Sequence, residues 1–137
     1  MAHWLVKSEP GVWSWEAQVK AGTTNWNGVR NYQAANNMKA MKRGDRVFFY
    51  HSGDERQIVG IVEVAREYYP DSTDASGRFG QVDVKAVMPL SQPVTLDHIK
   101  QDDKLNHLAL VKQSRLTVQP VDAAAWARIC KLGGVKG

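Results

Sequence analysis

Two apolar runs separated by a short polar turn stand in the middle of the chain. Residues 45–51, DRVFFYH, are rich in bulky and β-branched side chains, and residues 58–69, IVGIVEVAREYY, form a second and longer run of the same type. The segment between them, SGDERQ, has the composition of a turn. This pattern predicts an antiparallel β-hairpin. Gly60 lies inside the second run, which indicates a β-bulge or the close approach of another group to the backbone.

The residues at the N-terminal end predict one strand and one helix. HWLVK, at 3–7, has the composition of a strand, and the proline and glycine of SEPG end it. Ser14 is a suitable N-cap for a helix over WEAQVKA, and Gly22 is a suitable stop. The polar stretch TTNWNG, at 23–28, is expected to be a loop.

A second helix is predicted from Asn31 to Gly44, because apolar residues follow helical spacing there. The apolar positions are Ala34, Ala35, Met38 and Met41. After the hairpin, residues 70–80 are rich in Pro, Gly, Ser and Asp and predict a surface loop. The alternating pattern from residue 81 predicts a strand that ends at Pro89.

The C-terminal part predicts short helices around a last strand. Thr95 can cap a helix over TLDHIK, and a further helical turn is expected over 102–110. SRLTVQPV, at 114–121, reads as the final strand. Asp122 can cap a terminal helix, AAAWARICKL, which Gly133 closes.

Together these elements predict the fold class. Five or six short antiparallel strands are expected, with helices inserted between them and one helix at the C-terminal end. An open sheet of this size leaves unpaired edges, so an α+β fold with a small closed or nearly closed β-barrel surrounded by short helices is expected. A parallel sheet is disfavoured because strands and helices do not alternate regularly. The 137 residues are enough for a single domain, 1–137, with its own core.

The composition leaves the partner open but removes support for several catalytic classes. The net charge of +4, from 18 Lys and Arg against 14 Asp and Glu, permits nucleic-acid binding without requiring it. The phosphate-binding loop, the dinucleotide-binding glycine pattern, HExxH and GxSxG are absent from the sequence. The four histidines lack metal-ligand spacing, and the single cysteine, Cys130, has the apolar neighbours of an inert buried thiol. No metal and no cofactor are expected.

The sequence gives an expectation for location as well. MAHWLVKSEP lacks the basic start and apolar run of a secretory signal, and no segment approaches the roughly 20 apolar residues needed to span a bilayer. We expect a cytoplasmic monomer with no membrane partner.

Aromatic and hydrogen-bonding side chains gather at predicted strand ends and in adjoining loops. They occur in KSEP (7–10), NWNGVRNY (25–32), FFYHSG (48–53) and SRL (114–116). Indole and phenol rings stack on nucleobases, and each such stack is worth about 1–3 kcal/mol. Ser, Asn and backbone amides can read the edge of a base, while Arg and Lys can meet a neighbouring phosphate. These segments therefore predict a pocket for a base.

The chain also resembles the EVE-domain family. KSEP after the first strand is followed in order by GVRNYQA, GDRVFFYHSG, IVGIVEV, YYPD and SRLTVQPV. This resemblance covers nearly the whole chain, so it is more specific than any one tetrapeptide. It implies a PUA-like β-barrel, similar to the YTH domains that read methylated adenine in RNA. It further implies a non-catalytic module that holds a modified or flipped-out base of RNA or DNA.

The resemblance assigns residues to this pocket. Trp26 would be a stacking wall, Arg115 would lie near the rim, and Phe79 stands where many relatives carry a tryptophan. The full set is Lys7, Ser8, Trp26, Arg30, Asn31, Tyr32, Tyr50, His51, Ser52, Phe79 and Arg115.

Other interpretations of these residues stay open at this point. Trp26 can pack beneath the barrel, Arg30 can be a solvated surface charge, and Arg115 can pair with an aspartate. Tyr50 and His51 can belong to a structural hydrogen-bond network. Two other functions are also open: a small enzyme acting on a nucleotide-like heterocycle with His51 as acid or base, and a protein-interaction module whose aromatic residues meet a peptide.

Overall fold

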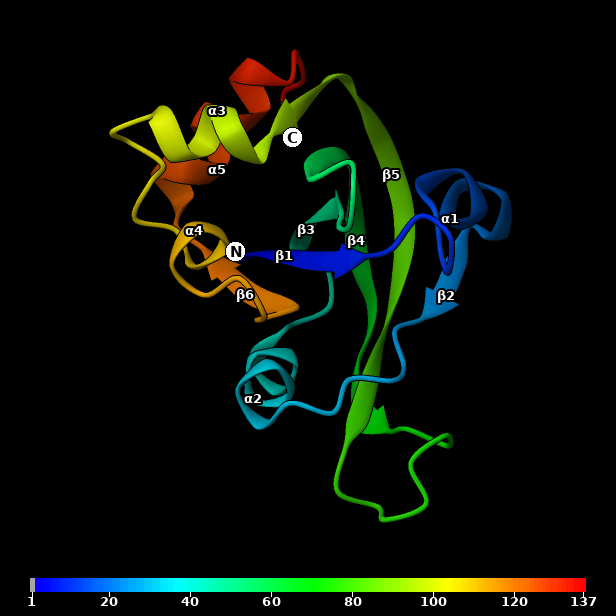
Figure 1. Ribbon diagram of the computed structural model, residues 1–137. Helices are drawn as coiled ribbons and strands as arrows, with labels where there is room; N and C mark the ends of the chain where they lie inside the picture. Colours follow the sequence, from blue (N-terminus) through cyan, green and yellow to red (C-terminus); the bar gives the residue numbers. More distant parts are fainter. Residues whose placement is uncertain (1) are drawn as a thin grey trace.

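The computed structural model describes residues 2–137, which form six strands and five helices (Figure 1). In chain order these are β1 (His3–Ser8), α1 (Trp15–Ala21), β2 (Thr23–Asn25), α2 (Tyr32–Ala40), β3 (Arg46–His51), β4 (Gln57–Pro70), β5 (Gly80–Thr95), α3 (Leu96–Gln101), α4 (Ala109–Lys112), β6 (Val118–Val121) and α5 (Ala123–Leu132). The predicted α+β class is confirmed. Figure 1 shows α3, α4 and α5 on one side of the long β4 and β5 ribbon and α1 on the other.

All six strands belong to one sheet, in the order β2-β5-β4-β3-β1-β6. Strands β3 and β4 form the predicted antiparallel hairpin, and its register shifts between Phe49 and Tyr50, opposite Gly60. Strands β1 and β3 are parallel, so the expectation of purely antiparallel pairing is wrong. The reason lies in the connection, since residues 9–45 carry α1, β2 and α2 and are long enough for the crossover that parallel neighbours require.

The sheet is not closed into the expected barrel. In residues 2–137, β2 pairs with β5 alone and β6 pairs with β1 alone, so these two strands are the edges of the sheet. Both are short, with three residues in β2 and four in β6, and Pro120 removes one backbone donor from β6. A closed barrel needs a continuous ladder around its circumference, and such short edges do not supply one.

Two predicted boundaries in the sheet are wrong. A loop was expected over 23–28, but Thr23–Asn25 pairs with Asp83 to Lys85 and forms β2. Strand β5 also continues past Pro89 to Thr95. Pro89 lies opposite Gly60, where the register of β4 and β5 is irregular, so its missing N–H interrupts the ladder little.

Helix boundaries follow their capping residues. The side chains of Ser14, Thr95 and Asp122 each accept a hydrogen bond from the backbone N–H three residues later, so these predicted caps are confirmed. Asn31, which was not predicted as a cap, caps α2 in the same way. Helix α2 ends at Ala40 rather than at Gly44. The helical turn expected over 102–110 is mostly non-helical turn, and the last strand begins at Val118 instead of residue 114.

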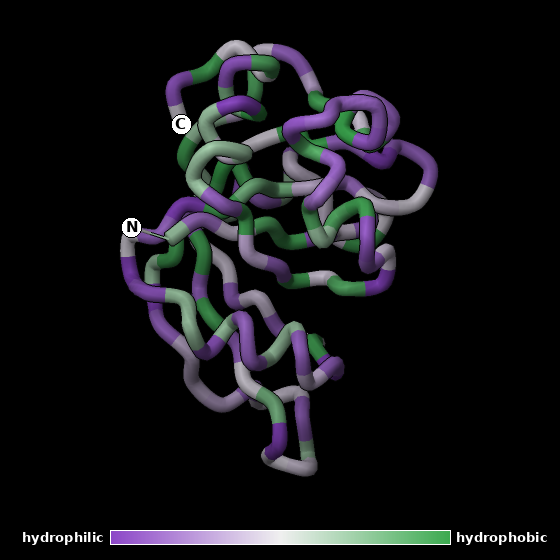
Figure 2. The backbone as a smooth tube through the Cα atoms, turned by 90° about the vertical axis from the view of Figure 1, so that its left-hand side faces the viewer, coloured by the Kyte–Doolittle hydropathy of each residue, from purple (hydrophilic) through white to green (hydrophobic). Residues whose placement is uncertain are grey.

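Alternation along the strands divides the core between the two faces of the sheet. Leu5 and Phe48 pack on one face with apolar residues of α3, α4 and α5, among them Trp126. Val6 and Phe49 pack on the other face with residues of α2 and with Trp26. Figure 2 shows the most hydrophobic stretches running through the middle of the molecule. The apolar helix positions Met38 and Met41 are buried, and so are Trp4 and Trp126.

Cys130 is buried, and burial raises the pKa of its thiol to about 11, as expected of an inert cysteine. Within residues 2–137, no helix is both long enough and apolar enough to cross a membrane.

Candidate functional site

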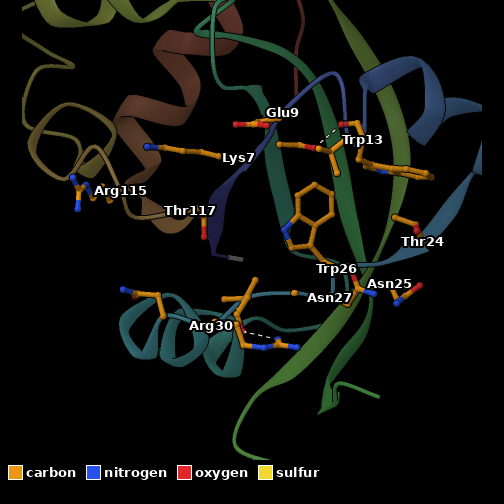
Figure 3. A pocket seen from close by; sticks show the side chains of 15 residues that line it. Lys7, Glu9, Trp13, Thr24, Asn25, Trp26, Asn27, Arg30, Arg115 and Thr117 are labelled. Atoms are coloured by element: carbon orange, nitrogen blue, oxygen red, sulfur yellow. Dashed lines mark hydrogen bonds between the residues drawn. The ribbon is translucent and has the colours of Figure 1, made fainter. Parts of the chain in front are cut away.

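A cavity of about 710 Å³ lies between the two edge regions of the sheet (Figure 3). On one side it is bounded by the end of β1 and by Arg115 and Thr117, just before β6; on the other side lie Thr24 and Asn25 of β2. Residues 26–31, which we call the pocket strap, complete the lining together with Glu9, Val12 and Trp13 from the segment before α1. The cavity therefore lies between β2 and the segment that leads into β6.

Trp26 belongs to both the core and the cavity wall. Its side chain is only 8% exposed, its backbone N–H donates to Val82 O at 2.7 Å, and its ring meets Phe49 edge-on with centroids 5.6 Å apart. In the described part of the chain, the one fully buried side-chain nitrogen without a partner is on Arg46. The indole N–H of Trp26, for which no acceptor is found in residues 2–137, therefore reaches the cavity surface. Both interpretations of Trp26, packing residue and pocket wall, describe its position.

Trp13 is a second indole at the cavity, and sequence reasoning did not assign it there. Its Nε1 donates to Gln18 Oε1 at 2.9 Å, and the fully buried Gln18 amide in turn donates to Gly22 O at 3.0 Å. Figure 3 shows the Trp26 ring face-on and the Trp13 ring edge-on, so the two planes differ. The hydroxyl of Ser8 donates to the Trp13 carbonyl across the turn after β1, a contact that the sequence pattern does not reveal.

The end of β1 contributes a cation and a positioning group. Lys7 Nζ donates to Ser114 O at 2.8 Å and lies 5.8 Å from the centre of the Tyr50 ring. Burial lowers the pKa of Lys7. Ser8 is 9% exposed and uses its hydroxyl to hold Trp13 in place. The ammonium group of Lys7 is thus held by the Ser114 carbonyl, while the Lys7 side chain lines the cavity.

Arg30 lines the cavity but is held by the loop after β4. Its Nη1 lies 3.1 Å from Asp71 Oδ2, and its Nη2 donates to Thr73 Oγ1 at 3.0 Å. Asp71 Oδ2 also accepts the backbone N–H of Gly28 at 2.8 Å. Burial alone would raise the pKa of Asp71, but hydrogen bonds from Thr73, Gly28 and Arg30 outweigh it and lower the pKa from 3.8 to about 2. The Arg30 guanidinium is therefore held by Asp71 and Thr73, while its side chain remains 39% exposed.

Asn31 and Arg115 also line the cavity as predicted, but only Asn31 has its side chain engaged by another described residue. Asn31 uses its Oδ1 to cap α2, accepting the Ala34 N–H at 2.9 Å. Arg115 is exposed and makes no ion pair with any residue in the range 2–137, so the predicted alternative of a bridge to an aspartate is not found there.

Five predicted pocket residues lie outside the cavity lining, and three of them surround the end of β3. Tyr50 is 3% exposed and packs with the α3, α4 and α5 face of the core. His51 Nε2 accepts the Trp15 backbone N–H at 3.0 Å, so its Nδ1 carries the proton directed at Glu55, 2.9 Å away. Ser52 donates its backbone N–H to Ser8 O. The hydrogen-bonding interpretation therefore describes His51, whereas Tyr50 is packed in the apolar core.

The other two residues outside the lining are aromatic. Tyr32 is 61% exposed and packs on Phe79 with ring centroids 5.0 Å apart. The Arg30 guanidinium lies 5.7 Å from the centre of the Phe79 ring. Phe79 is therefore not a second wall of the cavity; Trp13 has that position.

Comparison with known proteins places this geometry in a family. The family model for the EVE domain matches residues 2–132. A solved structure from Rhodopseudomonas palustris is 56% identical, with a TM-score of 0.93 over 98% of this chain and 94% of that one. The crystal structure of human THYN1 protein in complex with DNA containing 5-methylcytosine is 32% identical, with a TM-score of 0.90 and 100% of both chains covered.

A curated relative and a more distant fold complete the comparison. Thymocyte nuclear protein 1 from Gallus gallus is 37% identical over 87% of this chain, which spans 63% of that relative's length. The YTH domain of the Zygosaccharomyces rouxii MRB1 protein, at 18% identity and a TM-score of 0.60, shares the fold alone. Because the EVE model matches residues 2–132, nearly all of the sequence, this chain belongs to the EVE domain family.

Proposed function

We propose that this protein is a nucleic-acid reader that holds one modified or unpaired base in the cavity between the sheet edges. The observation that carries the proposal is the pairing of two indoles, Trp13 and Trp26, with a cationic rim formed by Lys7 and Arg115. Flat aromatic walls bind any base face, and cations beside them meet the phosphate of the same strand.

The edge of the base would meet a small set of polar groups. The Trp26 indole N–H has no acceptor in the described residues, and because it lies in the plane of its ring it can donate to a sugar or phosphate oxygen beside the base but not to a base stacked on the ring. Glu9, Asn25 and Asn27 also line the cavity, and a carboxylate can accept from an exocyclic amino group. A ligand that offers both an acceptor and an amino donor, as cytosine and adenine do, suits this lining.

The choice of a first ligand rests on the relatives. The human THYN1 structure contains DNA with 5-methylcytosine, and this chain covers that whole structure. Because the chain spans less than two thirds of the chicken relative, partners of the complete relative are not carried over. Flipping a base from a duplex costs a few kcal/mol, so single-stranded or damaged DNA should bind more readily than an intact duplex.

We propose binding without chemistry. Both ring nitrogens of His51 are engaged, one by Trp15 and one by Glu55, and His51 does not line the cavity. A general base needs a free nitrogen within hydrogen-bond reach of the reacting proton. This arrangement supports a structural role for His51 over the enzyme hypothesis.

Tryptophan fluorescence titration tests the proposal. Short single strands carrying one cytosine, 5-methylcytosine, adenine or N6-methyladenine are added to the wild type and to Trp26→Phe. Saturable quenching that favours a modified base, and that weakens in the variant, supports the reader. Phe is chosen because Trp26→Ala would empty a core position and cost about 3–5 kcal/mol of stability. Binding of peptides in place of nucleic acid would support the protein-interaction alternative.

Three further expectations belong to this proposal. We propose that the open sheet is a PUA-like barrel left incomplete where the cavity lies, and that the protein acts as a cytoplasmic monomer. Sedimentation at increasing concentration tests the oligomeric state, and cell fractionation tests the location.

A further inference from the structure

An exposed aromatic pair adjoins the cavity without entering it. Tyr32, at the start of α2, is 61% exposed and packs at a tilt of 36° on the half-buried ring of Phe79. Large aromatic side chains are usually buried, so an aromatic surface left open beside a cavity marks a contact site. The pair is not required to close the core, because Tyr32 and Phe79 belong to neither buried cluster.

Arg30 connects this pair to the cavity. It lines the cavity, and its guanidinium also lies 5.7 Å from the centre of the Phe79 ring. Its two terminal nitrogens are engaged by Asp71, Thr73 and the Val29 carbonyl, so its plane is fixed. The surface formed by Tyr32, Phe79 and Arg30 is therefore continuous with the cavity rim.

The loop after β4 holds this surface rigid. The Phe79 backbone N–H donates to Asp74 Oδ2 at 2.7 Å, and the Phe79 carbonyl accepts from the Asp71 backbone N–H at 3.2 Å. A surface fixed before binding loses little conformational freedom when a ligand arrives. Aromatic rings and a planar guanidinium are the groups on which exposed bases stack.

We propose that Tyr32, Phe79 and Arg30 form a second stacking platform for the nucleotide next to the base held in the cavity. This inference rests on the proposed function and extends it: the natural ligand is a single-stranded segment of two or more nucleotides, not a free nucleoside. The strand meets Lys7 and Arg115 with its phosphates, places one base against Trp13 and Trp26, and lays the neighbouring base on Tyr32.

Affinity as a function of ligand length tests the platform. The modified nucleoside that binds best is compared with a trinucleotide carrying it in the central position, for the wild type, Tyr32→Ala, Tyr32→Phe and the control Val19→Ala. Val19 is a second exposed apolar residue, in α1, that does not line the cavity. Tyr32→Ala should weaken trinucleotide binding about fivefold to a hundredfold and leave nucleoside binding unchanged. Tyr32→Phe and Val19→Ala should behave as the wild type.

The other outcomes are distinct. If Tyr32→Ala weakened nucleoside and trinucleotide binding equally, Tyr32 would belong to the base pocket. If it weakened neither, the proposed stacking platform would be refuted. Self-association of the wild type that Tyr32→Ala abolishes would assign the surface to a protein contact instead. Failure of every nucleoside and strand to bind the wild type would overturn the proposed function itself and the platform with it.

Discussion

The guanidinium of Arg30 and the carboxylate of Asp71 tie the pocket strap to the loop after β4. Arg30 Nη1 lies 3.1 Å from Asp71 Oδ2, and the Asp71 side chain is fully buried while that of Arg30 is 39% exposed. The same oxygen holds the Gly28 amide. Asp71 does not line the cavity, so the shape of the cavity depends on a residue outside it.

The buried Asp71 carboxylate makes stability depend on pH. Its folded pKa, about 2, lies below the ordinary value of 3.8, so its contribution is present above pH 3.8 and is lost as the pH falls through about 2. The contribution is about 2 kcal/mol near neutral pH, of which about 1 kcal/mol is lost by pH 3. Urea unfolding at pH 6 and pH 3 should therefore show a smaller drop for Asp71→Asn than for the wild type. An equal drop in both proteins would show that Asp71 is not the titrating group.

Gly60 is required by the ring of Trp15. A Cβ at Gly60 would lie 2.5 Å from Trp15 Cη2, and the ring is fixed between this backbone and Phe49. Gly60→Ala should lower the free energy of unfolding by about 1–3 kcal/mol through overpacking. Gly11→Ala is the matched control, because nothing lies within 4 Å of its added Cβ. Thermal denaturation of both variants measures this difference. A Gly60→Ala variant as stable as the wild type would contradict the packing of Trp15 on Gly60.

Local patterns predicted those parts of the fold that local chemistry decides. The hairpin, the caps at Ser14, Thr95 and Asp122, and the buried pair Phe48 and Phe49 need only neighbouring residues, and all are present. Pairings across long connections were not predictable in this way. The parallel contact of β1 with β3 and the three-residue β2 depend on where distant segments meet.

The candidate site follows the same division. Tyr50 and His51 are adjacent in a strand, so their side chains point to opposite faces of the sheet. Tyr50 accordingly packs with Phe48 on one face, while His51 contacts the ring of Phe49 on the other. Trp13 was missed because its place at the cavity depends on the turn after β1 and on the buried amide of Gln18.

His51 should matter for stability and not for ligand chemistry. His51→Leu removes the acceptor of the Trp15 N–H and should cost about 1–3 kcal/mol of stability, whereas the Gln side chain of His51→Gln can still accept that bond and should cost less. Both variants should bind the reader ligand as the wild type does, measured well below their unfolding temperatures. Turnover of a nucleoside by the wild type that both variants lose would establish the enzyme hypothesis instead.

Arg115 should carry part of the salt dependence of binding. Because it is exposed and makes no ion pair in residues 2–137, it is available to one phosphate. Arg115→Ala should weaken the binding of all single strands by a similar factor. It should also make the dependence of log K on log salt less steep by about 0.7. Lys131→Ala, at the end of α5, removes the same charge away from the cavity and should leave the slope unchanged. An unaltered slope in Arg115→Ala would show that Arg115 does not contact a phosphate of the bound nucleic acid.

The five tryptophans offer the most direct test of the reader pocket. In NMR spectra of the ¹⁵N-labelled protein, the indole N–H signals of Trp13 and Trp26 should shift when a single strand with 5-methylcytosine is added. The signals of Trp4, bonded to Asp45, and of Trp126, stacked on Phe48, should stay in place. This pattern, stronger than with unmodified cytosine, is the predicted result. Shifts confined to Trp126, or no shift with any modified strand, would contradict a base-binding cavity between the sheet edges.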